Sequence, residues 1–208
     1  MKITVVGAAG MAGSRVIAEA LGRGHRVTAV FRGARPDSLS PEVIAVRGDA
    51  TDVDHMTQLF VRADAIVGAT RPAAGSESDV PATTTALLDA AAATGTRALL
   101  IGGSAPLPSP SGGLVFDDAQ YVPPAVRTIA AASIAQLDAC RAHTADWVYL
   151  SPPALLEPGA RTGGYRRGAT TLVVAADGSS RISVEDLAIA VVDELENPGH
   201  ERHFAVGY

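Results

Sequence analysis

Three glycines near the start of the chain constrain the fold more than any other feature. Gly7, Gly10 and Gly13 follow directly after the β-branched run Lys2–Val6, and the apolar residues after them recur with helical spacing. A second β-branched run follows at Arg26–Phe31. Strand, tight turn, helix and strand within about thirty residues make a βαβ unit. Its two strands are expected to be parallel and joined by a right-handed crossover.

The same alternation continues through most of the chain. A last helix is expected to begin at Ser183, where Asp186 completes the spacing of a capping box, and to end before Pro198 and Gly199. Alternating strands and helices are typical of an α/β fold, so we predict a Rossmann-type doubly wound parallel sheet with helices on both faces. The other predicted strands are Val43–Val46, Ala65–Gly68, Ala98–Ile101 and Trp147–Leu150, and the predicted helices are Val53–Val61, Thr83–Ala93 and Val126–Ala142.

Length and composition indicate one folded domain. The chain has 208 residues, of which 47% are hydrophobic and 19% charged, and this supplies enough apolar surface for a core. We interpret residues 1–208 as a single domain of this fold, in which residues 151–181 form a substrate-side insertion. Gly102–Gly113 is rich in Gly, Pro and Ser and follows a predicted strand, so we expect it to line the rim of a site.

Charge and cysteine content exclude several classes of partner. A net charge of -5 and a pI near 5.5 argue against binding to nucleic acid or to an anionic membrane. The uncharged stretch Ala98–Phe116 holds too many Gly, Pro and Ser residues for a membrane-spanning helix, and we expect a cytoplasmic protein. Cys140 is the only cysteine, so we expect no disulfide and no metal site, with His200 and His203 at the surface.

Lysine is almost absent from this chain. Lys2 is the only one, and the other basic residues are all arginine. A Schiff-base lysine, a Walker-type phosphate lysine and the Tyr-x-x-x-Lys pair of ordinary short-chain dehydrogenases each require a lysine beyond the first strand. The sequence therefore excludes these three mechanisms.

The segment GAAGMAG, between a strand and a helix, has the context of a dinucleotide-binding fingerprint. One glycine permits the sharp turn, another lets the backbone approach a pyrophosphate, and the third allows close packing of helix on strand. The helix N-terminus offers free N–H groups to the phosphates. We predict that Gly7, Gly10, Met11, Ala12 and Gly13 bind the cofactor, and the alternative is a purely structural glycine turn.

The ends of the second and third strands carry candidate residues for the adenosine side. An NAD-specific site ordinarily has Asp or Glu at the end of the second strand, but Arg32 occupies this place. With help from Arg35, it suits the 2'-phosphate of NADP, and we expect NADPH to bind better than NADH. A solvated arginine is the alternative. Asp49 could accept a hydrogen bond from the adenine amino group, or it could cap the loop before the next helix. The remaining cofactor-binding candidates are Ala50, Ala69 and Thr70.

Several motifs together resemble the atypical short-chain dehydrogenase/reductases, and more narrowly their NAD(P)H-binding, NmrA-like branch, which includes biliverdin reductase B, also called flavin reductase. The resemblance covers nearly the whole chain. It implies hydride transfer from NADPH to a flat acceptor such as a flavin, tetrapyrrole or quinone, with Ser104 matching the serine that follows the fifth strand. A histidine near the family's substrate would fall at Pro153 or Ala154, so this chain lacks it. The motifs are GAAGMAG at Gly7–Gly13, Arg32, Gly48-Asp49, Gly102-Gly103-Ser104 and SRISVED at Ser180–Asp186.

These observations favour a reductase in which Ser104 orients a small-molecule hydride acceptor and the cofactor performs most of the chemistry. The alternative is a non-catalytic sensor that binds NADP(H) and reports redox state to a partner protein. A sugar-nucleotide epimerase or dehydratase is disfavoured by the missing Tyr/Lys pair and the short C-terminal half. Weaker site candidates, each with a structural alternative, are Tyr121, Tyr165, Arg166, Arg167 and the pair Asp117 and Asp118, whereas Trp147 is expected in the core.

Overall fold

The computed structural model describes residues 1–37 and 39–208, and its centre is an eight-stranded sheet in the order β3-β2-β1-β4-β5-β6-β10-β8. All neighbouring strands of this sheet are parallel except β8, which runs antiparallel to β10. This is the predicted Rossmann-type fold. The strands are β1 (Lys2–Val6), β2 (Arg26–Phe31), β3 (Ile44–Arg47), β4 (Ala65–Gly68), β5 (Arg97–Ile101), β6 (Trp147–Ser151), β8 (Arg166–Gly168) and β10 (His203–Gly207).

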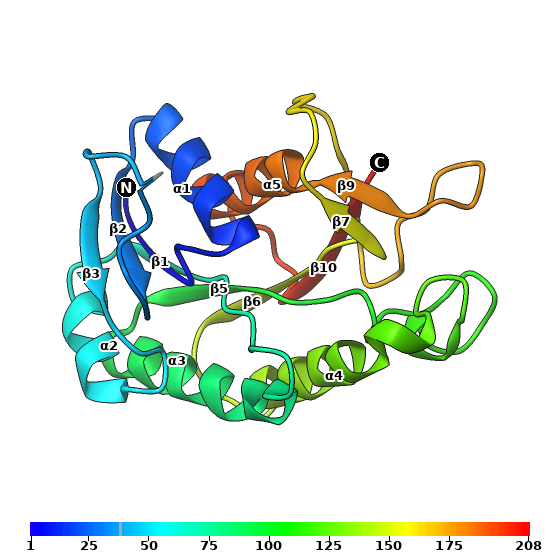
Figure 1. Ribbon diagram of the computed structural model, residues 1–208, viewed down its shortest axis with the longest axis horizontal. Helices are drawn as coiled ribbons and strands as arrows, with labels where there is room; N and C mark the ends of the chain where they lie inside the picture. The colour runs from blue at the N-terminus through cyan, green and yellow to red at the C-terminus, as the bar shows by residue number, and fades with distance from the viewer. Residues whose placement is uncertain (38) are drawn as a thin grey trace.

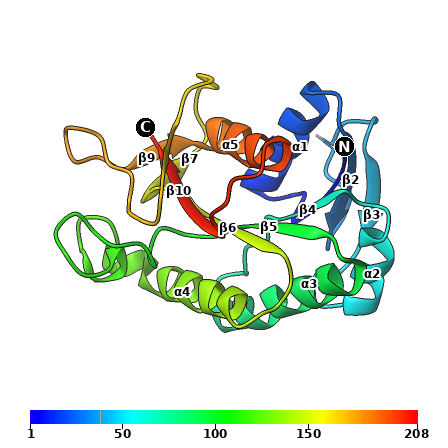
Figure 2. The same cartoon turned by 180° about the vertical axis from the view of Figure 1, so that it is seen from behind.

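Helices cover both faces of this sheet. Figure 1 shows α1 (Met11–Gly22) and α5 (Val184–Glu196) above the sheet, and α2 (Val53–Phe60), α3 (Val80–Thr94) and α4 (Arg127–Arg141) below it. The reverse view shows the same three layers (Figure 2). A second, parallel two-stranded sheet joins β7 (Leu155–Glu157) to β9 (Arg181–Ser183). The shorter 3-10 helices are η1 (Glu77–Asp79), η2 (Val115–Asp117) and η3 (Pro124–Val126).

Local sequence signals account for several helix ends. The Asp52 carboxylate accepts a hydrogen bond from the backbone N–H of His55 at the start of α2. Ser183 does the same for the N–H of Asp186 at the start of α5, and this is the cap predicted there. Gly95 ends α3 with a φ of 65°, the left-handed conformation that glycine adopts most easily. The start of α1 differs, because its N-cap is Gly10, which has no side chain to satisfy the first N–H groups.

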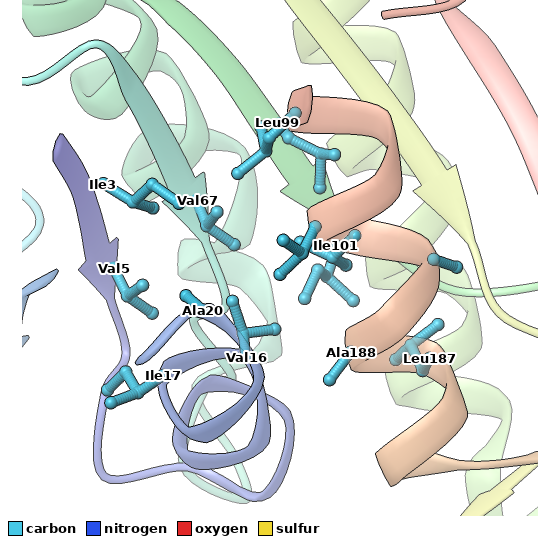
Figure 3. Packing of buried hydrophobic residues seen from close by; sticks show 14 of the residues in the cluster. Ile3, Val5, Val16, Ile17, Ala20, Val67, Leu99, Ile101, Leu187 and Ala188 are labelled. Carbon is cyan, nitrogen blue, oxygen red and sulfur yellow. The ribbon is translucent and has the colours of Figure 1, made fainter. Parts of the chain in front are cut away.

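The hydrophobic core lies on both faces of the sheet because parallel strands are covered by helices on either side. In Figure 3, Ile3 and Val5 of β1 and Ile101 of β5 point toward α1 and α5, where they meet residues such as Val16 and Ala188. The opposite face packs against α2, α3 and α4. Among its buried residues are Val6, Val30, Ile66, Leu100, Met56, Phe60, Leu87, Leu137, Cys140, Trp147 and Tyr149. Trp147 is thus in the core, as expected.

The structure departs from the predicted elements mainly after Leu150. β7, β8 and β9 have three residues each and were not predicted. β10 was also missed, and its position corrects the expectation that His203 is a surface residue. Because β10 pairs with β6 inside the sheet, His203 is half-buried and lies edge-on to Tyr149, with ring centroids 5.3 Å apart. His200 is exposed. Among the described residues, no helix is both long and apolar enough to cross a membrane.

Candidate functional site

The sheet reverses its winding between β1 and β4, which are neighbours although β1 is followed by α1 on one face and β4 by α3 on the other. In open α/β sheets, ligands bind at this switch point, beyond the carboxyl ends of the strands. Along the sheet, the ends of β3, β2, β1, β4 and β5 follow one another in space. The loops after them carry, in the same order, Asp49, Arg32, the glycine loop Gly7–Gly13, Ala69 with Thr70, and Ser104.

The glycine loop fits its place only because it has no side chains at two positions. Gly7 has a φ of 91°, and a Cβ added there would lie 2.4 Å from the carbonyl oxygen of Ala69 on the neighbouring strand. A Cβ at Gly13 would lie 2.3 Å from the carbonyl oxygen of Gly7. Gly7 therefore makes the turn and Gly13, which is buried, lets α1 pack closely on the loop.

Gly10 has a different place, at the exposed N-cap of α1. Its N–H donates to the carbonyl of Gly7 at 2.9 Å, and the first helical bond runs from the N–H of Ser14 to the carbonyl of Gly10. The N–H groups of Met11 and Ala12 therefore have no partner within the helix. No acidic residue lies in this first turn. The exposed helix start, with its partial positive charge, suits an anion such as a pyrophosphate.

Arg32 lies directly after β2 and is exposed. No ion pair between described side chains involves Arg32. Arg47, at the end of the adjacent β3, donates from Nε to the carbonyl of Arg32 at 3.2 Å. Arg35 is also exposed and donates to the carbonyl of Ser40 at 3.4 Å. Arg47 thus lies at the end of β3, and Arg32 and Arg35 lie in the loop after β2, so that this corner of the sheet carries positive charge that suits a phosphate. Arg47 was not predicted, although it ends a strand next to Arg32.

Asp49 makes hydrogen bonds within its own loop, as the alternative to adenine binding requires. Its Oδ1 accepts from the N–H of Thr51 at 3.0 Å and from the Thr51 hydroxyl at 2.8 Å. These hydrogen bonds, and to a smaller extent the charge of Arg32, hold the pKa of the Asp49 carboxyl below its ordinary value. The carboxylate is exposed and ionised at neutral pH, and Oδ1 is committed to the loop. Ala50 is half-buried beside it.

Ser104 lies at the far end of the row, three residues after β5, and is half-buried. No hydrogen bond of its hydroxyl is found among the described residues, and no buried side-chain oxygen or nitrogen there lacks a partner. The Ser104 hydroxyl is therefore reached by solvent and available to a ligand. Its backbone carbonyl accepts from the N–H of Leu107 at 2.9 Å, which begins the turn that leads into the rim.

The rim and the predicted insertion lie against each other. The loop after β5 contributes Leu107, Val115 and Val122 to a small apolar cluster, and residues 151–181 contribute Leu172 and Val173. A backbone hydrogen bond adds to this contact: the N–H of Leu172 donates to the carbonyl of Pro108 at 3.3 Å. These two segments thus form one wall next to Ser104.

The weaker candidates have structural partners in the described chain. The Tyr121 hydroxyl donates to the carbonyl of Gly178 at 3.0 Å. The Tyr165 hydroxyl donates to Asp193 at 2.8 Å, and burial together with that carboxylate raises its pKa. Asp118 accepts from the hydroxyls of two serines of the rim. Each of these groups holds a loop in place.

Arg166 and Arg167 are likewise engaged. Arg166 donates to the carbonyls of Val174 and Tyr208. Arg167 pairs with Glu194 at 2.7 Å and lies over the ring of Phe204, 3.6 Å from its centroid. Both side chains therefore stabilise the end of the sheet, and neither of these contacts reaches the row of loops that carries Ser104.

The chain matches the family described as NAD(P)H-binding over residues 7–198. Among curated proteins, it is 34% identical over 218 residues to the uncharacterized protein YwnB of Bacillus subtilis, covering 97% of this chain and 95% of the relative. A solved structure from Bacteroides thetaiotaomicron, described as a candidate epimerase, is 33% identical with a TM-score of 0.90 and covers 100% of this chain and 96% of its own. Another, from Streptococcus pneumoniae, is described as a candidate NADH-flavin reductase. It is 26% identical with a TM-score of 0.87 and covers 100% of this chain and 99% of its own.

Proposed function

The chain belongs to the NAD(P)H-binding family, and from this premise we propose that it is an NADPH-dependent reductase that passes hydride to a flat acceptor such as a flavin or quinone. The observation that carries the proposal is the order of the loops along the sheet. An exposed arginine corner, a side-chain-free glycine turn and an available serine hydroxyl follow one another. This matches the order of adenosine, pyrophosphate and nicotinamide in an extended dinucleotide.

The residues at these loops fit such a cofactor. No side chain of Gly7 or Gly10 stands between the loop and a ligand, and the N–H groups of Met11 and Ala12 are available to the pyrophosphate. When bound, NADPH supplies the hydride. Ala69 and Thr70 lie directly beneath the glycine turn and would bound the site on the side of β4. The chain's own part is to bind, to orient the acceptor and to exclude water.

Arg32 is the basis for a preference for NADPH over NADH. A guanidinium paired with the 2'-phosphate contributes roughly 1.5 to 3 kcal/mol to binding, about one to two orders of magnitude in affinity. Titration calorimetry of both cofactors tests this, and we expect Arg32→Glu to reverse the preference. Arg62→Glu, an equal charge change at an exposed site after α2, is the matched control and should leave it unaltered. Equal affinity of the unmodified protein for both cofactors would contradict the assignment.

The Ser104 hydroxyl is expected to orient the acceptor. Since a flavin or quinone accepts hydride without a strong protein acid, Ser104→Ala should slow turnover by about 10 to 100-fold and leave the affinity for NADPH unchanged. Steady-state rates of NADPH oxidation, together with a fluorescence titration of NADPH, measure the two effects. An unchanged rate would remove the role of Ser104 and leave the reductase intact.

A screen of NADPH oxidation against flavins, quinones and aldehydes tests the reductase itself. The Streptococcus neighbour, described as a candidate NADH-flavin reductase, makes flavin the first acceptor to try. We propose that the acceptor binds beside Ser104, against the wall that the loop after β5 and residues 151–181 form together. If no acceptor supports oxidation, but a partner protein distinguishes NADPH from NADP, the protein is the sensor and not the reductase.

A further inference from the structure

The backbone of Gly103 is held by hydrogen bonds at its N–H and at its carbonyl, both to side chains of one strand. Its N–H donates to the Tyr149 hydroxyl at 3.2 Å, and its carbonyl accepts from the Ser151 hydroxyl at 2.9 Å. Both side chains come from β6, two residues apart, and therefore project from the same face of that strand. Gly103 is the residue immediately before Ser104. The backbone that carries the Ser104 hydroxyl is thus tied to the strand next to it.

Side chains pack so closely beneath this backbone that neither Gly102 nor Gly103 has room for a Cβ. A Cβ at Gly102 would lie 1.8 Å from Cζ of Tyr149, and a Cβ at Gly103 would lie 2.8 Å from Cβ of Ser133 on α4. The chain passes directly over the phenol ring, which is completely buried. The Tyr149 hydroxyl also lies 3.0 Å from the carbonyl of Ser133, to which it donates. Only glycine fits at positions 102 and 103, because Tyr149 and Ser133 occupy the space that a side chain would need.

His203 of β10 completes the arrangement. Its Nε2 lies 2.9 Å from the Ser151 hydroxyl. Because the single hydroxyl proton of Ser151 is donated to Gly103, His203 must donate its Nε2 proton to the serine oxygen. Burial, followed by the charge of Arg141, lowers the pKa of His203 to about 4, so the imidazole is neutral at physiological pH. The hydrogen-bond chain then runs in one direction, from His203 through Ser151 to the Gly103 carbonyl.

Both β6 hydroxyls are fully buried at positions where phenylalanine and alanine would fill nearly the same space. Burying a hydroxyl costs free energy unless it is hydrogen-bonded, and its net gain when bonded is modest. Their value to this fold is then geometric. We propose that Tyr149, Ser151 and His203 are positioning residues, which hold the Gly103 peptide and, through it, the neighbouring serine hydroxyl against the acceptor. This inference rests on the proposed function, because it assigns the acceptor to Ser104.

A double-mutant cycle on turnover tests the proposal. Ser151→Ala removes one hold on the peptide, and we expect kcat with the flavin to fall by about tenfold, since small misplacements of a positioning group are costly in rate. The affinity for NADPH should change less than twofold, because the glycine loop and Arg32 are untouched. In a Ser104→Ala background, Ser151→Ala should have no further effect on kcat. If the two effects multiply instead, or if Ser151→Ala alone leaves kcat unchanged, the proposal is wrong.

Thr96→Val is the matched control, because it also removes a buried hydroxyl, just before β5 and thus at the opposite end of that strand from Ser104. It should leave kcat unaltered. A general loss of packing would lower the kcat of both variants alike, and that result would overturn the positioning role.

Amide hydrogen exchange followed by NMR tests the hold without any turnover. In the full chain, Tyr149→Phe should raise the exchange rate of the Gly103 amide at least tenfold relative to the Gly102 amide, which is bonded to the carbonyl of Leu150. Equal changes at both amides would overturn the inference. If none of the acceptors tested supports NADPH oxidation, but the exchange pattern is as expected, the proposed function is contradicted and the hold on Gly103 is established.

Discussion

His203 should make the stability of the protein depend on pH in a range where most side chains do not titrate. In the unfolded chain its pKa takes the ordinary value of 6.5, whereas burial, followed by the charge of Arg141, lowers it to about 4 in the folded protein. Between these values the unfolded state binds more protons than the folded state, so stability falls as the pH falls. The full effect, reached below the folded pKa, is about 3 kcal/mol.

The pH range best suited to measuring this effect lies near the unfolded pKa of His203. Between about pH 7.5 and pH 5.5 the linkage relation gives a loss of roughly 1.3 kcal/mol from His203 alone. The carboxylates with lowered pKa, such as Glu19 and Asp186, lose their stabilisation only at lower pH. The expected loss in this window therefore belongs to histidine, and a substitution can assign it to one residue.

Urea denaturation at the two pH values measures this difference. His203→Gln, which retains an amide N–H for Ser151, should lose about 1.3 kcal/mol less on acidification than the unmodified protein. His200→Gln, at an exposed position, is the control and should behave as the unmodified protein does. An identical pH dependence in the unmodified protein and His203→Gln would refute the reasoning from burial.

Two further predictions concern the glycine loop and the core. Gly10→Val should abolish NADPH binding in calorimetry while the far-ultraviolet circular dichroism stays unchanged, because a side chain at this exposed N-cap obstructs the approach of the pyrophosphate; a folded variant with full affinity would place the cofactor elsewhere. Cys140 is buried, and burial raises the pKa of its thiol to about 12, so iodoacetamide should modify it only in denaturant, as mass spectrometry can determine. Rapid alkylation of the folded protein would contradict that burial.

The first half of the fold could be predicted because its signals are local. The βαβ unit of Lys2–Phe31 is indicated by neighbouring residues: a β-branched run, a glycine turn, apolar residues at helical spacing and a second β-branched run. The three-residue strands after Leu150 have no such signal, because a single pairing partner stabilises each of them. β8, for example, contains Arg166 and Arg167 and is a strand only because β10 lies beside it.

The candidate site divides in the same way. The positions of Arg32 and the glycine loop at the edge of the sheet could be predicted because each lies at a fixed place after its strand. The arrangement around Gly103 could not, because it joins the loop after β5 to residues of β6 and β10 that are far apart in the chain. The Gly102-Gly103 pair was visible in the sequence, but its cause, the phenol ring of Tyr149 beneath it, is a tertiary contact.

The position of β10 has a consequence for how the protein is made. Its residues, His203–Gly207, lie near the end of the sequence but occupy an interior place in the sheet, between β6 and β8. A chain emerging from the ribosome can assemble β1 to β6 from segments already synthesised, but the place beside Tyr149 stays empty until β10 has also been synthesised. Pairing across more than fifty residues is also slow to form. A nascent chain would thus form the loops after β1 to β4 before β10 exists, and would acquire a fixed Ser104 only once β10 has paired with β6.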